Sequence, residues 1–436
     1  MTSTRIETAA ADPALLRRVV LGGAIGSFVE WYEFGVYGFL AAILAKVFFP
    51  GVGGGSGILA TFAVFAVAFF ARPLGGFLWG YIGDRIGRRR TLAITVLAIS
   101  VATALIGVLP SEATAGVAAP ILLVALRVLQ GVAAGGEISG AVSFIAEHSA
   151  PRRRGTNVAT VQAGSVLGNL VGALIPGIMI ILLPAPAMVS WGWRIPFLVA
   201  VVLGLAGVYI RRRLEETPYF LALEQEGSRA KNPLAEALTG RAHLVALARA
   251  FGVVALNGAS FFLIVGYLPT FASTSLHLTG WAAFAPPVIA LAAALVAIFV
   301  GAALSDRIGR RKVLLWSAGG LVVLAYPCFA LITSGTYGLI VVGLVVFGLL
   351  SGAYGAVTQV TLAEMFPTKV RVSGHGVAYN LAVAIFGGTA PYLLTALNGA
   401  TGSKVVGAYF IAVVALLSLL VVLTVRETAG NELRQV

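Results

Sequence analysis

A short basic motif occurs twice in this chain and constrains its fold more than any other feature. Residues 80–90 read GYIGDRIGRRR, and residues 302–312, about half a chain length later, read AALSDRIGRRK. Each copy lies between two long apolar runs. Two copies of one loop, half a chain apart in an apolar sequence, indicate a duplicated bundle of membrane-spanning helices, which is how secondary transporters are commonly built.

The composition supports a membrane protein and excludes an ordinary soluble domain. The chain has 436 residues, of which 59% are hydrophobic and only 11% are charged. Many of its apolar runs approach the ~20 residues needed to cross a bilayer. A formal net charge of +13 would suggest nucleic-acid binding in a soluble protein, but here Lys and Arg gather in short loops, as membrane topology requires. We therefore expect no nucleic-acid partner.

The apolar runs predict an all-α membrane protein with twelve transmembrane helices in two six-helix bundles related by an internal repeat. The expected spans cover residues 17–46, 57–81, 91–110, 119–147, 155–183, 191–211, 244–272, 281–304, 313–333, 338–365, 373–397 and 405–426. The longest polar segment, 212–243, is the predicted linker between an N-terminal bundle at 1–211 and a C-terminal bundle at 244–436.

The distribution of Lys and Arg predicts the orientation in the membrane. The loops richest in these residues all fall on the side that also receives both termini, which by the positive-inside rule is the cytoplasmic side. Residues 1–14 are polar and contain Glu7, Asp12 and Pro13, so we expect no cleaved signal peptide.

Acidic residues among the basic loops of the cytoplasmic side are duplicated as well. Span four ends in Glu147 with Arg154 seven residues on, and span ten ends in Glu364 with Arg371 at the same distance. Such a charge cluster can latch one conformational state and break in another, whereas the simpler alternative is a solvated loop. The predicted gating residues are Asp84, Arg88, Glu147, Arg154, Asp306, Arg310, Glu364 and Arg371.

Ionisable residues also occur inside the predicted spans, where each is a candidate for function because burial in a membrane is costly. In span one, Glu30, Glu33 and Tyr37 share one helical face. Span four carries Arg127, which is predicted to reach a depth comparable to that of Glu33 and to form an ion pair with it.

A carboxylate whose proton affinity depends on its Arg partner can take up a proton at one face of the membrane and release it at the other. The alternative is a static ion pair that fixes two helices. We predict proton coupling through Glu33, with Glu30 and Glu137 as the next candidates.

Uncharged polar side chains in the spans complete a possible substrate site. Each of them alone is more often an interhelical hydrogen bond than a ligand contact. The second half has no counterpart of Arg127, since Leu344 occupies the corresponding position. The predicted substrate-binding residues are Arg127, Gln130, Tyr37, Gln162, Asn169, Asn257, Tyr379 and Asn380.

Glycine residues recur at four-residue intervals in two spans. Gly164, Gly168 and Gly172 do so in span five, and Gly131 and Gly135 do so in span four. Small residues at this spacing predict helices that approach each other closely.

The chain lacks the residues that several classes of protein need for their function. There is no phosphate-binding loop for ATP, and a single Cys328 with four scattered His residues gives no metal site. An enzyme inside the membrane would need a cluster of a nucleophile and a base, and the sequence contains none. The repeat and the buried charges argue against a channel, and the lack of a sizeable soluble domain argues against a membrane sensor. We expect neither a metal nor another cofactor.

The chain resembles the major facilitator superfamily and, within it, the metabolite–proton symporter family. The duplicated loops resemble the signature of the superfamily, and residues 127–131, RVLQG, resemble its helix-four motif. The narrower family is suggested by EWYEF at 30–34, ARPLGG at 71–76, GGE at 135–137, WGWRIPF at 191–197 and EMFPTKVR at 364–371. One departure is Glu33, where the family usually has Asp.

The resemblance implies proton-driven import of a small organic solute by alternating access. Gln162 is similar to the carboxylate-transporting branch, whereas the first two spans are similar to the osmolyte branch. After span twelve only residues 427–436 follow, without the long coiled coil of osmosensing members. The leading expectation is a monomeric symporter of organic carboxylates in the bacterial cytoplasmic membrane. The alternatives are a symporter of proline- or betaine-type zwitterions and a proton-exchanging exporter.

Overall fold

The computed structural model describes residues 13–53, 55–86, 88–212, 240–368 and 370–433, and its regular elements within these ranges are all helices. The first half of the chain contains α1 (Pro13–Phe48), α2 (Gly55–Ile86), α3 (Arg88–Val108), α4 (Glu112–Ala115), α5 (Ala118–Ala134), α6 (Glu137–His148), α7 (Arg154–Leu182), α8 (Ala185–Ala187), η1 (Met188–Gly192) and α9 (Arg194–Arg212). The second half contains α12 (Arg241–Phe262), η2 (Leu263–Tyr267), α13 (Leu268–Thr274), α14 (Trp281–Ile308), α15 (Arg310–Ile332), α16 (Tyr337–Met365), α17 (Arg371–Ala382), η3 (Val383–Gly388), α18 (Ala390–Thr401) and α19 (Val406–Thr424).

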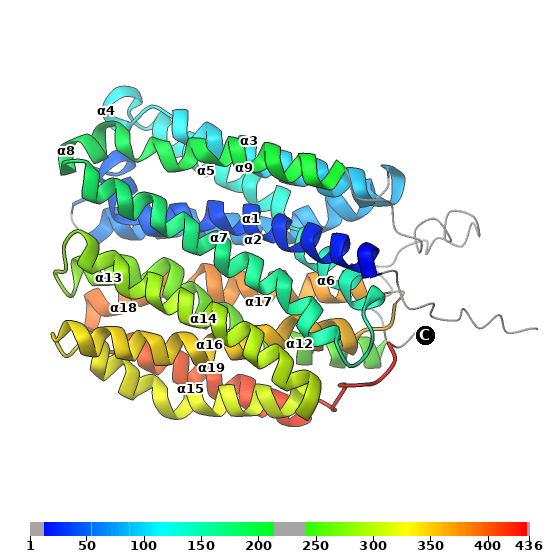
Figure 1. Ribbon diagram of the computed structural model, residues 1–436. Helices are drawn as coiled ribbons and strands as arrows, with labels where there is room; N and C mark the ends of the chain where they lie inside the picture. Colours follow the sequence, from blue (N-terminus) through cyan, green and yellow to red (C-terminus); the bar gives the residue numbers. More distant parts are fainter. Residues whose placement is uncertain (1–12, 54, 87, 213–239, 369, 434–436) are drawn as a thin grey trace, which may run out of the picture.

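The predicted all-α transmembrane fold is confirmed. Within the described ranges, eleven helical segments are long and apolar enough to cross a membrane, and the bent pair 185–192 and 194–210 gives a twelfth span if it is counted as one. Figure 1 shows α1–α9, the N-terminal half, beside α12–α19, the C-terminal half. The exact limits of the two bundles and of the linker stay predictions, because residues 213–239 lie outside the described ranges.

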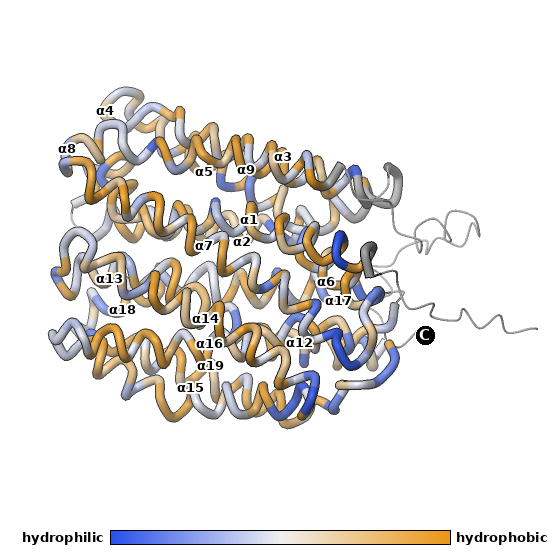
Figure 2. Tube along the Cα trace, viewed as in Figure 1, coloured by the Kyte–Doolittle hydropathy of each residue, from blue (hydrophilic) through white to orange (hydrophobic). Residues whose placement is uncertain are grey.

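The two ends of the helix array differ in polarity. The loops that precede α7, α15 and α17 lie at one end, together with the start of α1 and the end of α19 (Figure 1). We call this the basic end. Hydrophilic residues gather there, while the helix shafts are mostly hydrophobic (Figure 2). This is the pattern that a membrane imposes on short loops and long spans.

The predicted close approach of helices through glycine is confirmed for spans five and four. A Cβ atom on Gly168 of α7 would lie 2.2 Å from the Phe28 carbonyl oxygen of α1, and one on Gly131 of α5 would lie 1.9 Å from the Ala68 carbonyl oxygen of α2. The backbones of these helix pairs therefore touch. This packing holds α1 and α2 against the rest of the N-terminal half at the depth where their charged side chains lie.

Three spans that the sequence predicted as regular α-helices contain an irregular segment. Span four breaks between α5 and α6 at Gly135 and Gly136, and spans seven and eleven pass through the π-helical segments η2 and η3. Pro269 and Pro391 stand at the first or second position of the α-helices that follow these segments. Proline cannot donate a backbone hydrogen bond, so the preceding turn widens.

Candidate functional site

A buried ion pair joins α2 to α1, and we call it the central ion pair. Arg72 of α2 places Nη1 2.6 Å from Glu30 Oε1 of α1, and both side chains have at most 1% exposure. Arg72 Nε also donates to Asn380 Oδ1 of α17 at 3.0 Å. Arg72 entered the sequence prediction only as part of a family motif, so its role was missed. A lone Arg inside the apolar run of span two was the available signal.

Glu33 lies one helical turn from Glu30 but has different partners. Ser100 Oγ of α3 donates to Glu33 Oε1 at 3.0 Å, and the Thr103 hydroxyl donates to Oε2. The predicted ion pair with Arg127 is wrong, since no cation lies within 4 Å of Glu33 among the described residues. Hydroxyl partners suit a carboxyl group that takes up and releases a proton, because they hydrogen-bond to both of its forms.

Arg127 of α5 is fully buried and faces an aromatic surface instead. Its guanidinium carbon lies 3.8 Å from the centroid of the Tyr37 ring, and the rings of Phe34 and Phe65 flank it at 5.5 and 5.3 Å. Nη1 donates to Gln130 Oε1 at 2.9 Å. Within the described part of the chain, Nε and Nη2 have no hydrogen-bond partner. These two nitrogens form the edge of the guanidinium that grips a carboxylate through two parallel bonds.

Arg127 and Glu33 are connected indirectly. Gln130 Nε2 donates to Thr103 Oγ1 at 2.5 Å, and Thr103 in turn contacts Glu33. The structure therefore brings Arg127, Gln130 and Glu33 together through one hydroxyl group. Glu137 is held elsewhere, by Thr95 Oγ1 at 3.2 Å, at the start of α6.

Aromatic rings from both halves meet beside the central ion pair. Trp31 of α1 lies 5.0 Å from Phe261 and 5.6 Å from Phe262, both on α12, in edge-to-face arrangements. Phe262 also meets Phe69 of α2 edge to face at 4.7 Å. The Arg72 guanidinium carbon lies 5.8 Å from Trp31 and 5.9 Å from Phe69, so these rings already pack around a cation.

Two of the other predicted binding residues, Tyr37 and Asn169, form hydrogen bonds to backbone carbonyls. The Tyr37 hydroxyl donates to the Thr61 carbonyl at 3.0 Å, so only its ring faces Arg127. Asn169 donates to the Ser165 carbonyl, and its Oδ1 is buried without a partner among the described residues.

Two further candidates come from opposite halves. Gln162 of α7 and Asn257 of α12 both lie against Gly355 of α16, where an added Cβ would be 3.5 Å from Gln162 Nε2 and 2.7 Å from Asn257 Oδ1. Tyr379 is buried on α17, next to Asn380. These side chains stay predicted ligand contacts.

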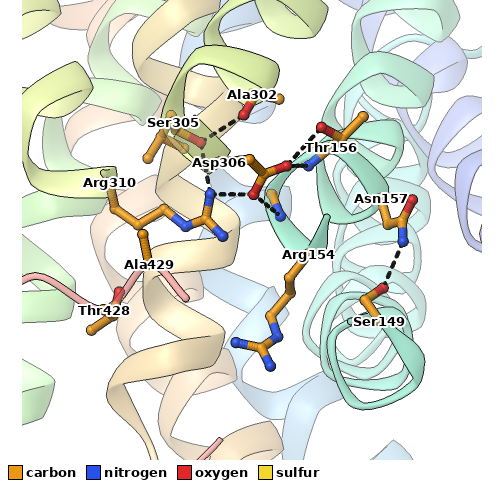
Figure 3. A network of polar contacts seen from close by, with 12 residues as sticks. Ser149, Arg154, Thr156, Asn157, Ala302, Ser305, Asp306, Arg310, Thr428 and Ala429 are labelled. Carbon is orange, nitrogen blue, oxygen red and sulfur yellow. Dashed lines mark hydrogen bonds and ion pairs between the residues drawn. The ribbon is translucent and has the colours of Figure 1, made fainter. Parts of the chain in front are cut away.

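At the basic end, Asp306 of the second motif copy caps a helix of the other half. Its Oδ1 accepts from Gly155 N at 2.9 Å, and its Oδ2 accepts from Thr156 N at 2.9 Å and from Thr156 Oγ1 at 2.7 Å (Figure 3). A carboxylate at a helix N-terminus is stabilised by the free N–H groups and by the helix dipole. This contact joins α14 to α7.

An ion-pair network continues from Asp306 and also crosses between the halves. Arg310 Nη1 lies 2.6 Å from Asp306 Oδ1, and Arg310 Nε lies 3.4 Å from Glu364 Oε2. Arg154, from the N-terminal half, reaches Glu364 Oε1 at 3.0 Å. A second bridge, from Arg371 Nη1 to Glu147 Oε1 at 2.6 Å, also crosses the interface. The side chains of Asp84 and Arg88 lie outside the described residues.

Glu427, just after α19, caps α15 and was missed by the sequence prediction. Burial acts to raise the pKa of Glu427, but hydrogen bonds from the backbone N–H groups of Ala429, Arg310, Arg311 and Thr428 outweigh it and lower the pKa below its ordinary value. The bonds to Arg310 N and Arg311 N measure 2.8 and 3.1 Å. The Thr428 hydroxyl donates to Glu364 Oε2 at 2.6 Å, so this segment joins the network.

Comparison with known proteins gives consistent relatives. The family model described as "Sugar (and other) transporter" matches residues 19–251 and 255–436. The proline/betaine transporters of Salmonella typhimurium (strain LT2) and Escherichia coli (strain K12) are each 36% identical, over 97% of this chain and 86% of theirs. The glycine betaine/proline/ectoine/pipecolic acid transporter OusA of Dickeya dadantii shows the same identity and coverage.

Solved structures share the fold. The major facilitator superfamily proton:xylose symporter XylE, bound to 6-bromo-6-deoxy-D-glucose, aligns with a TM-score of 0.79 over 96% of this chain and 98% of its own. A D-xylose–proton symporter structure aligns with a TM-score of 0.74 over 96% and 100%. The sequence identities are 17% and 19%, so these structures support the architecture alone.

Proposed function

This chain belongs to the sugar (and other) transporter family of the major facilitator superfamily and is a multi-pass membrane transporter, and we propose that it is a proton symporter of small zwitterions such as proline and betaines. The family and the all-helical fold account for secondary transport. The choice of substrate and of coupling ion is the proposal. We further propose that the basic end faces the cytoplasm of a bacterial cell.

The relatives favour the zwitterion alternative over the organic carboxylates that the sequence led us to expect. Three relatives that match nearly the whole chain are named for transport of proline and betaine or of related compounds. No relative among them is named for a di- or tricarboxylate.

The observation that carries the substrate class is the pairing of a free guanidinium edge with a ring cluster. Arg127 offers Nε and Nη2 to a carboxylate, and Phe34 and Phe65 connect it to the rings around Arg72. A betaine carries one carboxylate and one quaternary ammonium group. Rings that pack around the Arg72 guanidinium can also pack around the ammonium group of a substrate, because aromatic faces attract both cations.

For proton coupling, we propose that Glu33 carries the proton. We also propose that the ion pair between Glu30 and Arg72 weakens when substrate binds. Glu33 has hydroxyl partners rather than a cation, so it can exist in either protonation state without breaking an ion pair. Glu30 and Arg72 are shielded from solvent in this structure, with the halves joined at the basic end. Release into the cytoplasm then requires the bridges at the basic end to open.

Uptake into proteoliposomes tests the substrate class. Purified protein would be given an inward proton gradient and labelled glycine betaine, proline, succinate and 2-oxoglutarate in parallel. We expect glycine betaine or proline to accumulate, and we expect this accumulation to disappear when a protonophore is added. Accumulation of the dicarboxylates alone would overturn the zwitterion assignment. Protons that move in the direction opposite to the substrate would indicate the exporter alternative.

A further inference from the structure

One amide side chain joins the central ion pair to the contact between the two halves. Asn380, on α17 of the C-terminal half, accepts from Arg72 Nε through Oδ1 at 3.0 Å and donates through Nδ2 to the Gly135 carbonyl oxygen at 2.8 Å. Both partners belong to the N-terminal half. We propose that Asn380 is a positioning residue that transmits the charge state of the Glu30–Arg72 pair to the closure of the two halves.

The orientation of Arg72 depends on Glu30. Its Nη1 is 2.6 Å from Glu30 Oε1, and its Nη2 donates to the Ala134 carbonyl at 3.4 Å. With Nε on Asn380, all three nitrogens are engaged, so the planar guanidinium has one orientation. A proton on Glu30, or a substrate ammonium group among the rings around Arg72, weakens the bond from Nη1. The guanidinium can then rotate, and Nε leaves Asn380.

The other partner of Asn380 is available because span four is broken. Carbonyl groups at the end of a helix lack donors from the following turn, and in a membrane interior they must find them elsewhere. At the end of α5, Val132 O accepts from Trp79 Nε1 at 2.8 Å, Ala134 O accepts from Arg72, and Gly135 O accepts from Asn380. The break therefore leaves the Gly135 carbonyl oxygen as an acceptor for Asn380 of the C-terminal half.

The surroundings of this contact exclude water, which strengthens its dependence on charge. Glu30, Arg72 and Asn380 are 0%, 1% and 4% exposed. Gly76 of α2 lies beside the contact, and a Cβ there would be 3.4 Å from Gly135 O and 3.9 Å from Asn380 Nδ2. An unpaired donor or acceptor at this depth is costly, so loss of one bond favours separation of the halves.

A distance measurement on substrate-free protein tests the proposal. Spin labels would be placed at Arg152 and Arg307, two exposed residues at the basic end in different halves, in a Cys328→Ser background in lipid nanodiscs. Asn380→Leu keeps the approximate volume and removes both bonds. We expect the ratio of long to short distances to rise about tenfold. The matched control is Asn398→Leu, because Asn398 is also on span eleven but bonds to Ser275 within the same half.

A double mutant separates transmission of charge from simple packing. Glu30→Gln should raise the open fraction about fivefold in the parent, yet change it less than about twofold when combined with Asn380→Leu, because the link is already cut. Independent, multiplying effects of the two changes would overturn the proposal, as would an unchanged ratio in Asn380→Leu.

Two precautions keep the test decisive. If Asn380→Leu does not purify as a folded protein, Asn380→Ala is carried through the same cycle and judged by the same ratios. The proposed coupling rests on the proposed transport function, but the labelled protein contains no substrate. A wrong substrate class would therefore leave the distances unaffected, and failure of the uptake assay is distinguishable from failure here.

Discussion

Replacement of Arg127 should weaken substrate binding more than any other single change in the N-terminal half. Its Nε–Nη2 edge is buried and unpartnered within the described part of the chain, so a substrate carboxylate would form two charge-assisted bonds there. Loss of a buried charged contact costs about 2–5 kcal/mol, so Arg127→Ala should reduce affinity for glycine betaine by roughly 30-fold or more. Arg127→Lys keeps the charge without the fork and should cost about tenfold.

Isothermal titration calorimetry on purified protein measures this effect directly, with Arg194→Lys as the matched control. Arg194 is another Arg of the N-terminal half, but it lies at the start of α9 and donates to the backbone carbonyls of Gly107 and Leu109. A competing view is that Arg127 serves only to neutralise Glu33. It requires the double mutant Arg127→Ala with Glu33→Gln to recover near-normal affinity. The structure contains no such ion pair among the described residues, so we expect no recovery, and recovery would refute the role of Arg127 as anchor.

Four further outcomes follow from the same structure. Glu33→Gln should abolish uphill accumulation while substrate exchange persists, because an amide cannot carry a proton; normal accumulation would move the proton site to Glu30 or Glu137. Glu364→Gln should slow the transport cycle several-fold with little change in calorimetric affinity, and a loss of affinity with an intact cycle would argue against a latch. Transport should need no ATP, which omission of nucleotide from liposomes tests. The cap formed by Glu427 has a lowered pKa, so its stabilisation is present above the ordinary carboxyl pKa and is lost as the pH falls through the lowered value; thermal unfolding of Glu427→Gln should lack that acid-dependent part.

The fold was predictable from the sequence because a membrane leaves few choices. Apolar runs of span length, basic loops on one side and a motif repeated half a chain apart are each properties of the sequence alone, and together they specify the architecture. The bridge from Glu147 to Arg371 connects two residues that the repeat had singled out, although not as partners of each other.

The partners inside the membrane could not be derived in the same way. Depth along a helix placed Glu33 near Arg127, but the rotation and neighbours of each helix decide which groups touch, and hydroxyls of α3 occupy the place given to Arg127. Arg72 binds Glu30 because close packing in the N-terminal half brings α2 and α1 together. At the break in span four, the Gly135 carbonyl accepts from Asn380 of the other half, and helical periodicity cannot indicate such a partner.

Proton movement driven by the substrate is the most direct test of the proposed symport. Proteoliposomes would be loaded with a pH-sensitive dye at equal internal and external pH, with potassium and valinomycin holding the membrane potential at zero. Addition of glycine betaine outside should acidify the lumen, and the Glu33→Gln variant should give no acidification. Entry of labelled glycine betaine without any change in luminal pH, or with alkalinisation, would contradict proton symport.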